Sequence, residues 1–98
     1  MRVVPFYHMQ RPLIVANWKA YLGFEEVTHW MDVFQKGAPD MSNKTIVLAP
    51  SSIFLSSVSS QIKTATLPVG LAAQDVSMYE RGAVTGEVAA EVLKAFVI

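Results

Sequence analysis

Short apolar runs recur along the chain and alternate with segments of helical periodicity. The runs are PLIVAN (12–17), TIVLAP (45–50) and VGLAAQ (69–74), and a fourth, FVI (96–98), begins near the last residue. Their aliphatic residues are continuous rather than alternating with polar ones, which is typical of strands covered on both faces of a parallel sheet. The pattern predicts three buried strands and the start of a fourth.

Three segments between these runs carry an apolar stripe at helical spacing. Acidic residues begin the first segment and Lys36 ends it, an arrangement that complements the helix dipole. Ser51 or Ser52 follows Pro50 and is a plausible N-cap of the second segment. The segments and their stripes are 24–36 (Val27, Trp30, Met31, Phe34), 51–65 (Leu55, Val58, Ile62) and 87–96 (Val88, Val92, Leu93, Phe96).

The alternation of strands and helices predicts right-handed βαβ units and an α/β fold. One connection, SMYERGAVTGE (77–87), is about twice the usual 2–6 residues of such folds. A loop of that length after a strand indicates a functional segment or an interaction arm, and a plain surface loop is the alternative.

The composition indicates more apolar surface than a single small domain can bury in its own core. It has 98 residues, 52% of them hydrophobic and only 16% charged, whereas globular chains carry about a quarter charged residues. We therefore expect the chain to associate or to be part of something larger. The segment 12–98 is interpreted as the domain and 1–11 as a disordered lead-in, with an upstream start as the alternative for residues 1–8.

Several function classes are disfavoured by the charge and residue inventory. Net charge is zero, so nucleic acid and membrane surfaces are not expected partners. The chain has no cysteine, which excludes disulfides, thiol catalysis and cysteine zinc sites and fits a reducing cytosol. His8 and His29 have no triad or metal partner at useful spacing, and we expect both to be surface residues.

Polar residues follow two of the predicted strands. Asn17 and Lys19 end the first, and Gln74 and Asp75 end the third. Ligands of parallel α/β sheets bind beyond the carboxyl ends of the strands, and a lysine there suits a phosphate or a developing oxyanion. The alternative is a solvated lysine beside an asparagine that only ends a strand.

Taken together, the motifs closely resemble the triosephosphate isomerase family. The ANWK strand end, the AAQDVS strand end, the GAVTGE loop and LAPSSIFL occur in the family's order and spacing over residues 12–98. The resemblance implies a partial TIM (β/α)₈ barrel, about the first three βα units plus the start of strand four. It also implies a cytoplasmic homodimer that interconverts dihydroxyacetone phosphate and glyceraldehyde 3-phosphate in glycolysis and gluconeogenesis, with no metal or organic cofactor.

The resemblance also implies roles for single residues. Lys19 would be catalytic, holding the substrate phosphate and stabilising the enediolate, and Asn17 would bind near the substrate oxygens. Gln74, Thr85 and Gly86 would belong to the dimer interface, and Glu87 there would anchor the long loop through an arginine from further along the chain.

This chain departs from the family pattern at two places. Ala20, Tyr21, Leu22 and Gly23 replace the frequent Met-Asn-Gly after the lysine, and Ala89 stands where a serine often caps the following helix. The first difference affects the packing behind Lys19. The second removes a cap whose loss costs about 0.5–2 kcal/mol.

The resemblance implies that the proton-moving residues, a glutamate and a neutral histidine, come from later strands; the family is itself a well-known example of such pKa tuning. We therefore expect the 98-residue chain alone to be inactive. Three interpretations follow: a truncated isomerase whose full-length form is active, a non-catalytic partial barrel that pairs with a complementary chain or itself, and an unrelated flavodoxin-like module.

Overall fold

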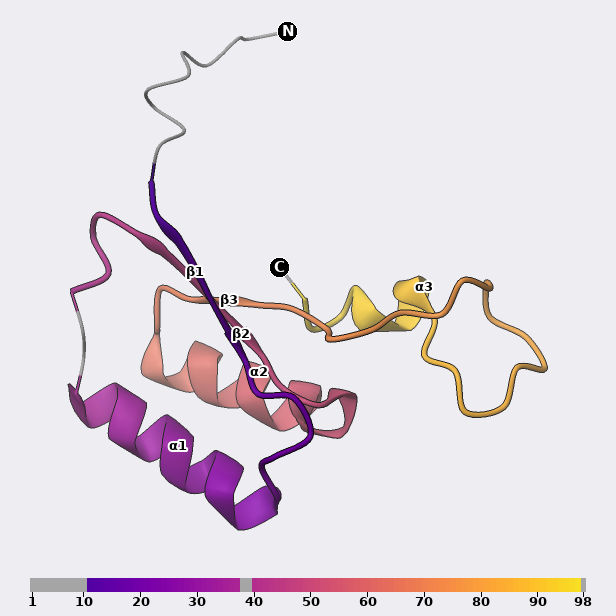
Figure 1. Cartoon of the computed structure of the whole chain (residues 1–98), viewed down its shortest axis with the longest axis horizontal. Helices are drawn as coiled ribbons and strands as arrows, with labels where there is room; N and C mark the ends of the chain where they lie inside the picture. Colours follow the sequence, from indigo (N-terminus) through magenta and orange to yellow (C-terminus); the bar gives the residue numbers. More distant parts are fainter. Residues whose placement is uncertain (1–10, 38–39, 98) are drawn as a thin grey trace, which may run out of the picture.

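The computed structural model describes residues 11–37 and 40–97, and its centre is a three-stranded parallel sheet in the order β1-β2-β3 (Figure 1). The strands are β1 (Leu13–Asn17), β2 (Thr45–Ala49) and β3 (Gly70–Leu71). Leu13 pairs with Thr45 and Asn17 with Ala49, while Val47 pairs with Gly70. The predicted alternation of strands and helices is confirmed for the first three strands.

The helices between the strands are α1 (Phe24–Gly37) and α2 (Leu55–Ala65), the latter preceded by a 3₁₀ turn η2 (Ser52–Phe54). Glu25 and Glu26 lie in the first turn of α1 and Lys36 in its last, as predicted. At the end of α2, Thr66 adopts a left-handed conformation and its N–H bonds the carbonyls of the last turn, a common helix stop.

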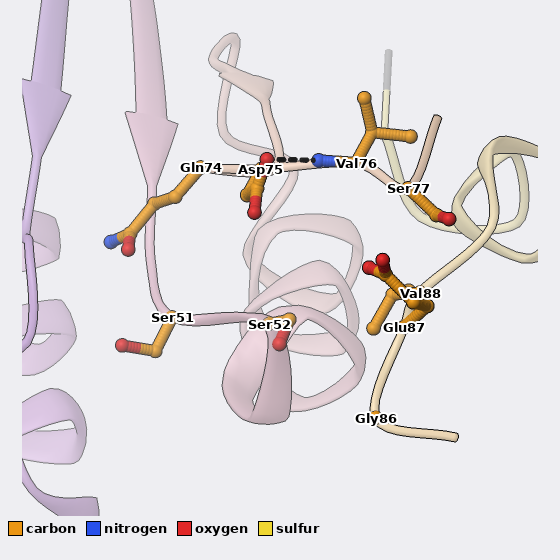
Figure 2. A pocket seen from close by; sticks show the side chains of 9 residues that line it. All are labelled: Ser51, Ser52, Gln74, Asp75, Val76, Ser77, Gly86, Glu87 and Val88. Atoms are coloured by element: carbon orange, nitrogen blue, oxygen red, sulfur yellow. Dashed lines mark hydrogen bonds between the residues drawn. The ribbon is translucent and has the colours of Figure 1, made fainter. Parts of the chain in front are cut away.

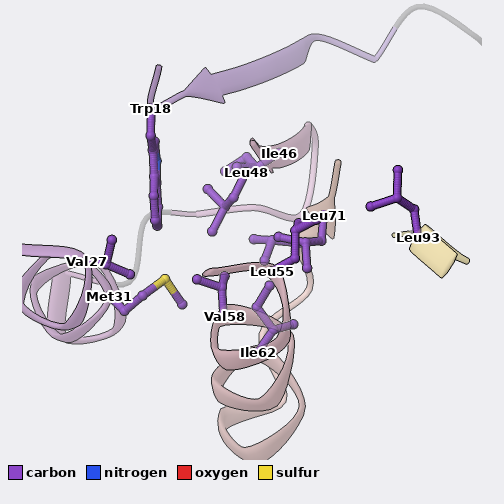
Figure 3. Packing of buried hydrophobic residues seen from close by; sticks show 11 residues of the cluster. Trp18, Val27, Met31, Ile46, Leu48, Leu55, Val58, Ile62, Leu71 and Leu93 are labelled. Carbon is purple, nitrogen blue, oxygen red and sulfur yellow. The ribbon is translucent and has the colours of Figure 1, made fainter. Parts of the chain in front are cut away.

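One face of the sheet and the two helices enclose the hydrophobic core (Figure 3). Met31 and Val27 come from α1, and Leu48 comes from β2. The α2 and β3 residues of the core are Leu55, Val58, Ile62 and Leu71. The opposite face of the sheet is open, because Leu13 is 65% and Val15 is 52% exposed. Side chains of a strand alternate between faces, so these two belong to the face that the helices do not cover.

The last third of the chain differs from the sequence-based expectation. The expected strand 69–74 is only Gly70–Leu71, and the expected helix 87–96 is only α3 (Ala90–Leu93). Phe96 lies in a turn and Val97 in no regular element, so the expected start of a fourth strand is not formed at these residues; Ile98 lies outside the described residues. A strand needs a neighbour for its ladder, and β3 pairs only with β2 among the described residues.

The long loop 77–87 is present and contains no helix or strand (Figure 1). Its base is closed by a hydrogen bond from the Ser77 N–H to the Val88 carbonyl, 2.9 Å long. The radius of gyration is 15.4 Å, above the value of about 13 Å expected for a compact chain of this size. The loop and α3 extend to one side of the sheet, which accounts for the open shape.

Candidate active site at the carboxyl end of β1

Lys19 follows β1 in a left-handed backbone conformation, with φ at 54°. Only Lys19 and Thr66 have positive φ among the non-glycine residues of the described segments, and Thr66 is explained by its place at a helix end. For an L-residue this conformation costs about 1–2 kcal/mol. Such strain persists where surrounding contacts hold it, and it concentrates at functional sites.

Two neighbours in the chain hold the start of this turn. The Asn17 Oδ1 accepts a hydrogen bond from the Lys19 N–H at 2.9 Å, so the asparagine acts as a local turn residue. The Trp18 N–H bonds the Ala49 carbonyl at 3.1 Å and continues the ladder one residue past β1. The side chain of Trp18 is 7% exposed and anchors the turn in the core.

The Lys19 carbonyl is held from two other strand ends. It accepts hydrogen bonds from Ser51 Oγ at 3.0 Å and from Gln74 Nε2 at 2.9 Å. The same Gln74 nitrogen donates to the Ala49 carbonyl at 2.8 Å. We call Asn17, Ser51 and Gln74 the lysine clamp, because together they bond both the N–H and the carbonyl of Lys19.

The clamp changes the sequence-based interpretation of Ser51. That residue does take the N-cap position of η2, but its side chain makes no capping hydrogen bond. The expected N-cap position of Ser51 is therefore confirmed, but its hydroxyl donates to the Lys19 carbonyl instead of accepting a bond from the helix. Neither the clamp bonds of Ser51 and Gln74 nor the left-handed Lys19 was predicted, and the one available signal was the position of these residues at strand ends.

A polar cavity of about 270 Å³ lies beside the clamp, between the ends of β2 and β3 and the long loop (Figure 2). Its walls carry the carboxylates of Asp75 and Glu87 and no basic side chain from the described residues. One Asp75 oxygen accepts the Val76 N–H at 2.8 Å. A phosphate would be repelled by these carboxylates, so an anion at this end of the sheet belongs beside Lys19 rather than in this cavity. The other lining residues are Ser51, Ser52, Gln74, Ser77, Gly86 and Val88.

Comparison with known proteins decides the family. The sequence model of triosephosphate isomerase matches residues 12–98. The chain belongs to the triosephosphate isomerase family. Named relatives include a triosephosphate isomerase from Delftia acidovorans, 33% identical over 88 residues, and one from Synechococcus sp., 36% identical over 87 residues. A third, from Coxiella burnetii, is 33% identical over 87 residues.

These matches cover most of this chain but only a part of each triosephosphate isomerase. The Delftia alignment spans 90% of this chain and 35% of its relative, the Synechococcus one 88% and 35%, and the Coxiella one 89% and 33%. The chain therefore spans about a third of the length of the curated relatives it matches. Family membership and the three-stranded parallel sheet together confirm the expected partial barrel.

The residues expected at the family's dimer interface lie mostly in the long loop. Thr85, Gly86 and Glu87 are exposed, and Gly86 has φ at 88°, a conformation that favours glycine. The Glu87 N–H bonds the Val84 carbonyl at 3.1 Å and tightens the tip. Gln74 is engaged within its own chain by the clamp. Their interface role stays a prediction.

Other expectations concern histidines, metals and membranes. His29 is exposed on α1, as expected, and His8 lies outside the described residues. Within residues 11–37 and 40–97, no three acidic or histidine side chains gather in a way that could hold a metal ion. A search of the same residues finds no helix with the length and apolar character to cross a membrane.

Proposed function

We propose that this chain supplies the electrostatic part of a triosephosphate isomerase site, with Lys19 as its catalytic group. The observation that carries the proposal is the left-handed Lys19, held by three side-chain hydrogen bonds at the carboxyl end of β1. A strained residue that is held by so many contacts points to a function that depends on its position.

The chemistry suits a triose phosphate. The ammonium group of Lys19 would attract the substrate phosphate and stabilise the negative oxygen of the enediolate as it forms. Asn17 uses its oxygen in the clamp, which leaves its amide N–H groups as donors for a substrate oxygen. The reaction moves a proton between adjacent carbons of dihydroxyacetone phosphate and glyceraldehyde 3-phosphate, so it also needs an acid and a base.

We infer that the acid and base come from the two thirds of the family's length that this chain does not span. A positioned base alone contributes about 10²–10⁴-fold to rate. The 98-residue chain alone is therefore expected to give no measurable turnover in a coupled isomerase assay. Turnover by the purified chain, lost on Lys19→Met, would contradict this expectation.

Activity is expected when the chain is combined with the complementary part of a relative. The complement is the segment of the Delftia acidovorans enzyme that follows the matched residues, co-expressed with this chain. In that complex Lys19→Met should lower kcat/KM by about 100-fold or more. Lys63→Met is the matched control, because it removes an equal charge from the last turn of α2. Equal losses from both variants would refute the role of Lys19.

The proposal includes the oligomeric state, the cellular location and the pathway of the complete enzyme. We propose a cytoplasmic homodimer of glycolysis and gluconeogenesis, joined through the long loop. Thr85→Arg in the active complex should weaken the dimer, measured by light scattering, without unfolding it. An unchanged mass at all concentrations would contradict the interface, and fractionation of cells tests the location.

A second candidate function is a non-catalytic partial barrel that associates with a complementary chain or with itself. The open face of the sheet favours it, because Leu13 and Val15 are more than half exposed, and unpaired strand edges promote association. Light scattering on the purified chain distinguishes the cases. A stable monomer at micromolar concentration would count against self-association.

A further inference from the structure

The Lys19 carbonyl lies in the middle of a tight turn. The Tyr21 N–H bonds the Trp18 carbonyl at 3.4 Å, which closes the turn around Lys19 and Ala20. β-turns of different types differ mainly in the orientation of this central peptide group. The peptide group between Lys19 and Ala20 can therefore rotate while the turn stays closed, unless other contacts hold its carbonyl.

Both peptide groups that flank the Lys19 Cα are held by side chains. On one side the Lys19 N–H donates to Asn17 Oδ1 at 2.9 Å. On the other side the carbonyl accepts from Ser51 Oγ at 3.0 Å and from Gln74 Nε2 at 2.9 Å, which uses both of its lone pairs. Because φ and ψ are the two soft dihedrals of a residue, holding both peptide planes fixes the direction of the Lys19 Cα–Cβ bond. The ammonium group extends from that bond.

The two donors to this carbonyl are not equivalent. Gln74 Nε2 also donates to the Ala49 carbonyl at 2.8 Å, so its loss affects the junction of β2 and β3 as well. Ser51 is half-buried at the N-cap position of η2, where its side chain makes no capping hydrogen bond. Figure 2 shows the side chains of Ser51 and Gln74 pointing to the same side, away from Glu87. The Ser51 hydroxyl thus serves the Lys19 carbonyl rather than the start of the helix.

We propose that Ser51 is a positioning residue for Lys19. Its hydroxyl fixes the orientation of the peptide group between Lys19 and Ala20, and this orientation directs the ammonium group toward the substrate. A hydrogen bond of this kind shifts the balance between two orientations by about two- to tenfold. The consequence for catalysis rests on the proposed function, whereas the hold of Ser51 on the peptide group does not.

NMR on the isotope-labelled chain measures the orientation of the peptide group. The φ angle of Ala20 changes when this group rotates, so the three-bond coupling between the Ala20 amide and α protons reports it. Ser51→Ala should change that coupling or give a second set of signals for Ala20 and Tyr21. Ser51→Thr keeps the hydroxyl and should give the wild-type signals. Ser52→Ala is the matched control, an exposed neighbour that lines the same cavity, and should also leave them unchanged.

Kinetics of the complex with the complementary segment of the Delftia acidovorans enzyme measure the effect on the reaction. Ser51→Ala should lower kcat about three- to tenfold, because a displaced ammonium group stabilises the developing enediolate less well. KM should change less than twofold, since the attraction for a phosphate falls off slowly with distance. Ser51→Thr should restore kcat. In a Lys19→Met background, Ser51→Ala should cost nothing further, because its effect acts through Lys19.

The outcomes separate this inference from the proposed function. An unchanged Ala20 coupling in Ser51→Ala overturns the inference, and so does an unchanged kcat where Lys19→Met lowers it. An equal loss from Ser51→Ala with and without Lys19 also overturns it, because Ser51 would then act by another route. A wild-type complex without turnover refutes the proposed function, and the NMR comparison still decides whether Ser51 holds the peptide group.

Discussion

Replacing Lys19 by glycine should stabilise the fold relative to alanine, contrary to the usual effect of glycine. At φ of 54°, a side chain with a Cβ is strained by about 1–2 kcal/mol, and glycine relieves this strain. Glycine loses about 0.5–1 kcal/mol more conformational entropy than alanine. The difference leaves Lys19→Gly more stable than Lys19→Ala by about 0.5–1 kcal/mol.

Urea unfolding followed by circular dichroism measures this difference. With a slope of about 1–3 kcal/mol/M for small proteins, the urea midpoint of Lys19→Gly should exceed that of Lys19→Ala by roughly 0.2–1 M. The same pair of substitutions at Thr28, an exposed position within α1, is the control, and there alanine should exceed glycine by about 1 kcal/mol. If alanine equals or exceeds glycine at position 19, the strain argument is wrong.

Three further predictions concern the clamp, a helix start and an exposed carboxylate. Gln74→Ala removes the hydrogen bonds to Lys19 and Ala49 and should destabilise the chain by about 1–3 kcal/mol in urea unfolding, at about 0.5–1.5 kcal/mol for each bond. Ala89→Ser adds an acceptor at the uncapped start of α3 and should raise stability by about 0.5–2 kcal/mol in the same assay. The side-chain and backbone hydrogen bonds of Ser42, aided by the charge of Lys44, hold the pKa of Asp40 below its ordinary value, and Ser42→Ala should raise it in a carboxyl NMR titration.

Each of these has a result that contradicts it. A Gln74→Ala variant as stable as wild type would mean that water replaces both bonds. Destabilisation by Ala89→Ser would show that the site, 7% exposed, does not accommodate a hydroxyl. Because the folded pKa of Asp40 is depressed, its contribution to stability is present above the unfolded pKa and is lost as pH falls through the folded pKa. A titration unaffected by Ser42→Ala would refute the assigned cause.

The elements that rest on local pattern were predictable. The stripe through Val27 and Met31 indicated α1 to within one residue at its end, and the aliphatic run 45–50 indicated β2. The lengths of the third strand and of α3 were overestimated. Several apolar residues that flank them are only partly buried within the described segments. Apolar content alone does not distinguish a residue that is hydrogen-bonded in a sheet from one that has no neighbouring strand to pair with.

The clamp could not be predicted from sequence. Gln74 and Lys19 are 55 residues apart in the sequence, and Ser51 and Lys19 are 32 apart. Only the register of the sheet brings these residues into contact. Nor does lysine signal a left-handed backbone, as glycine or asparagine would. The resemblance to a family indicated that Lys19 matters, while the structure adds how its backbone is held.

The single carbonyl of Lys19 joins the ends of three successive strands, so both of its side-chain hydrogen bonds depend on the assembled sheet. Ser51 reaches it only when β2 lies beside β1, and Gln74 only when β3 also lies beside β2. Before that point, of the three clamp bonds only the local one from the Lys19 N–H to Asn17 Oδ1 is available to hold the left-handed conformation. A chain that misaligns either strand loses a hydrogen bond to this carbonyl, and with it part of what holds the lysine in the position proposed for chemistry. The position proposed for the Lys19 backbone thus depends on the register of the whole sheet.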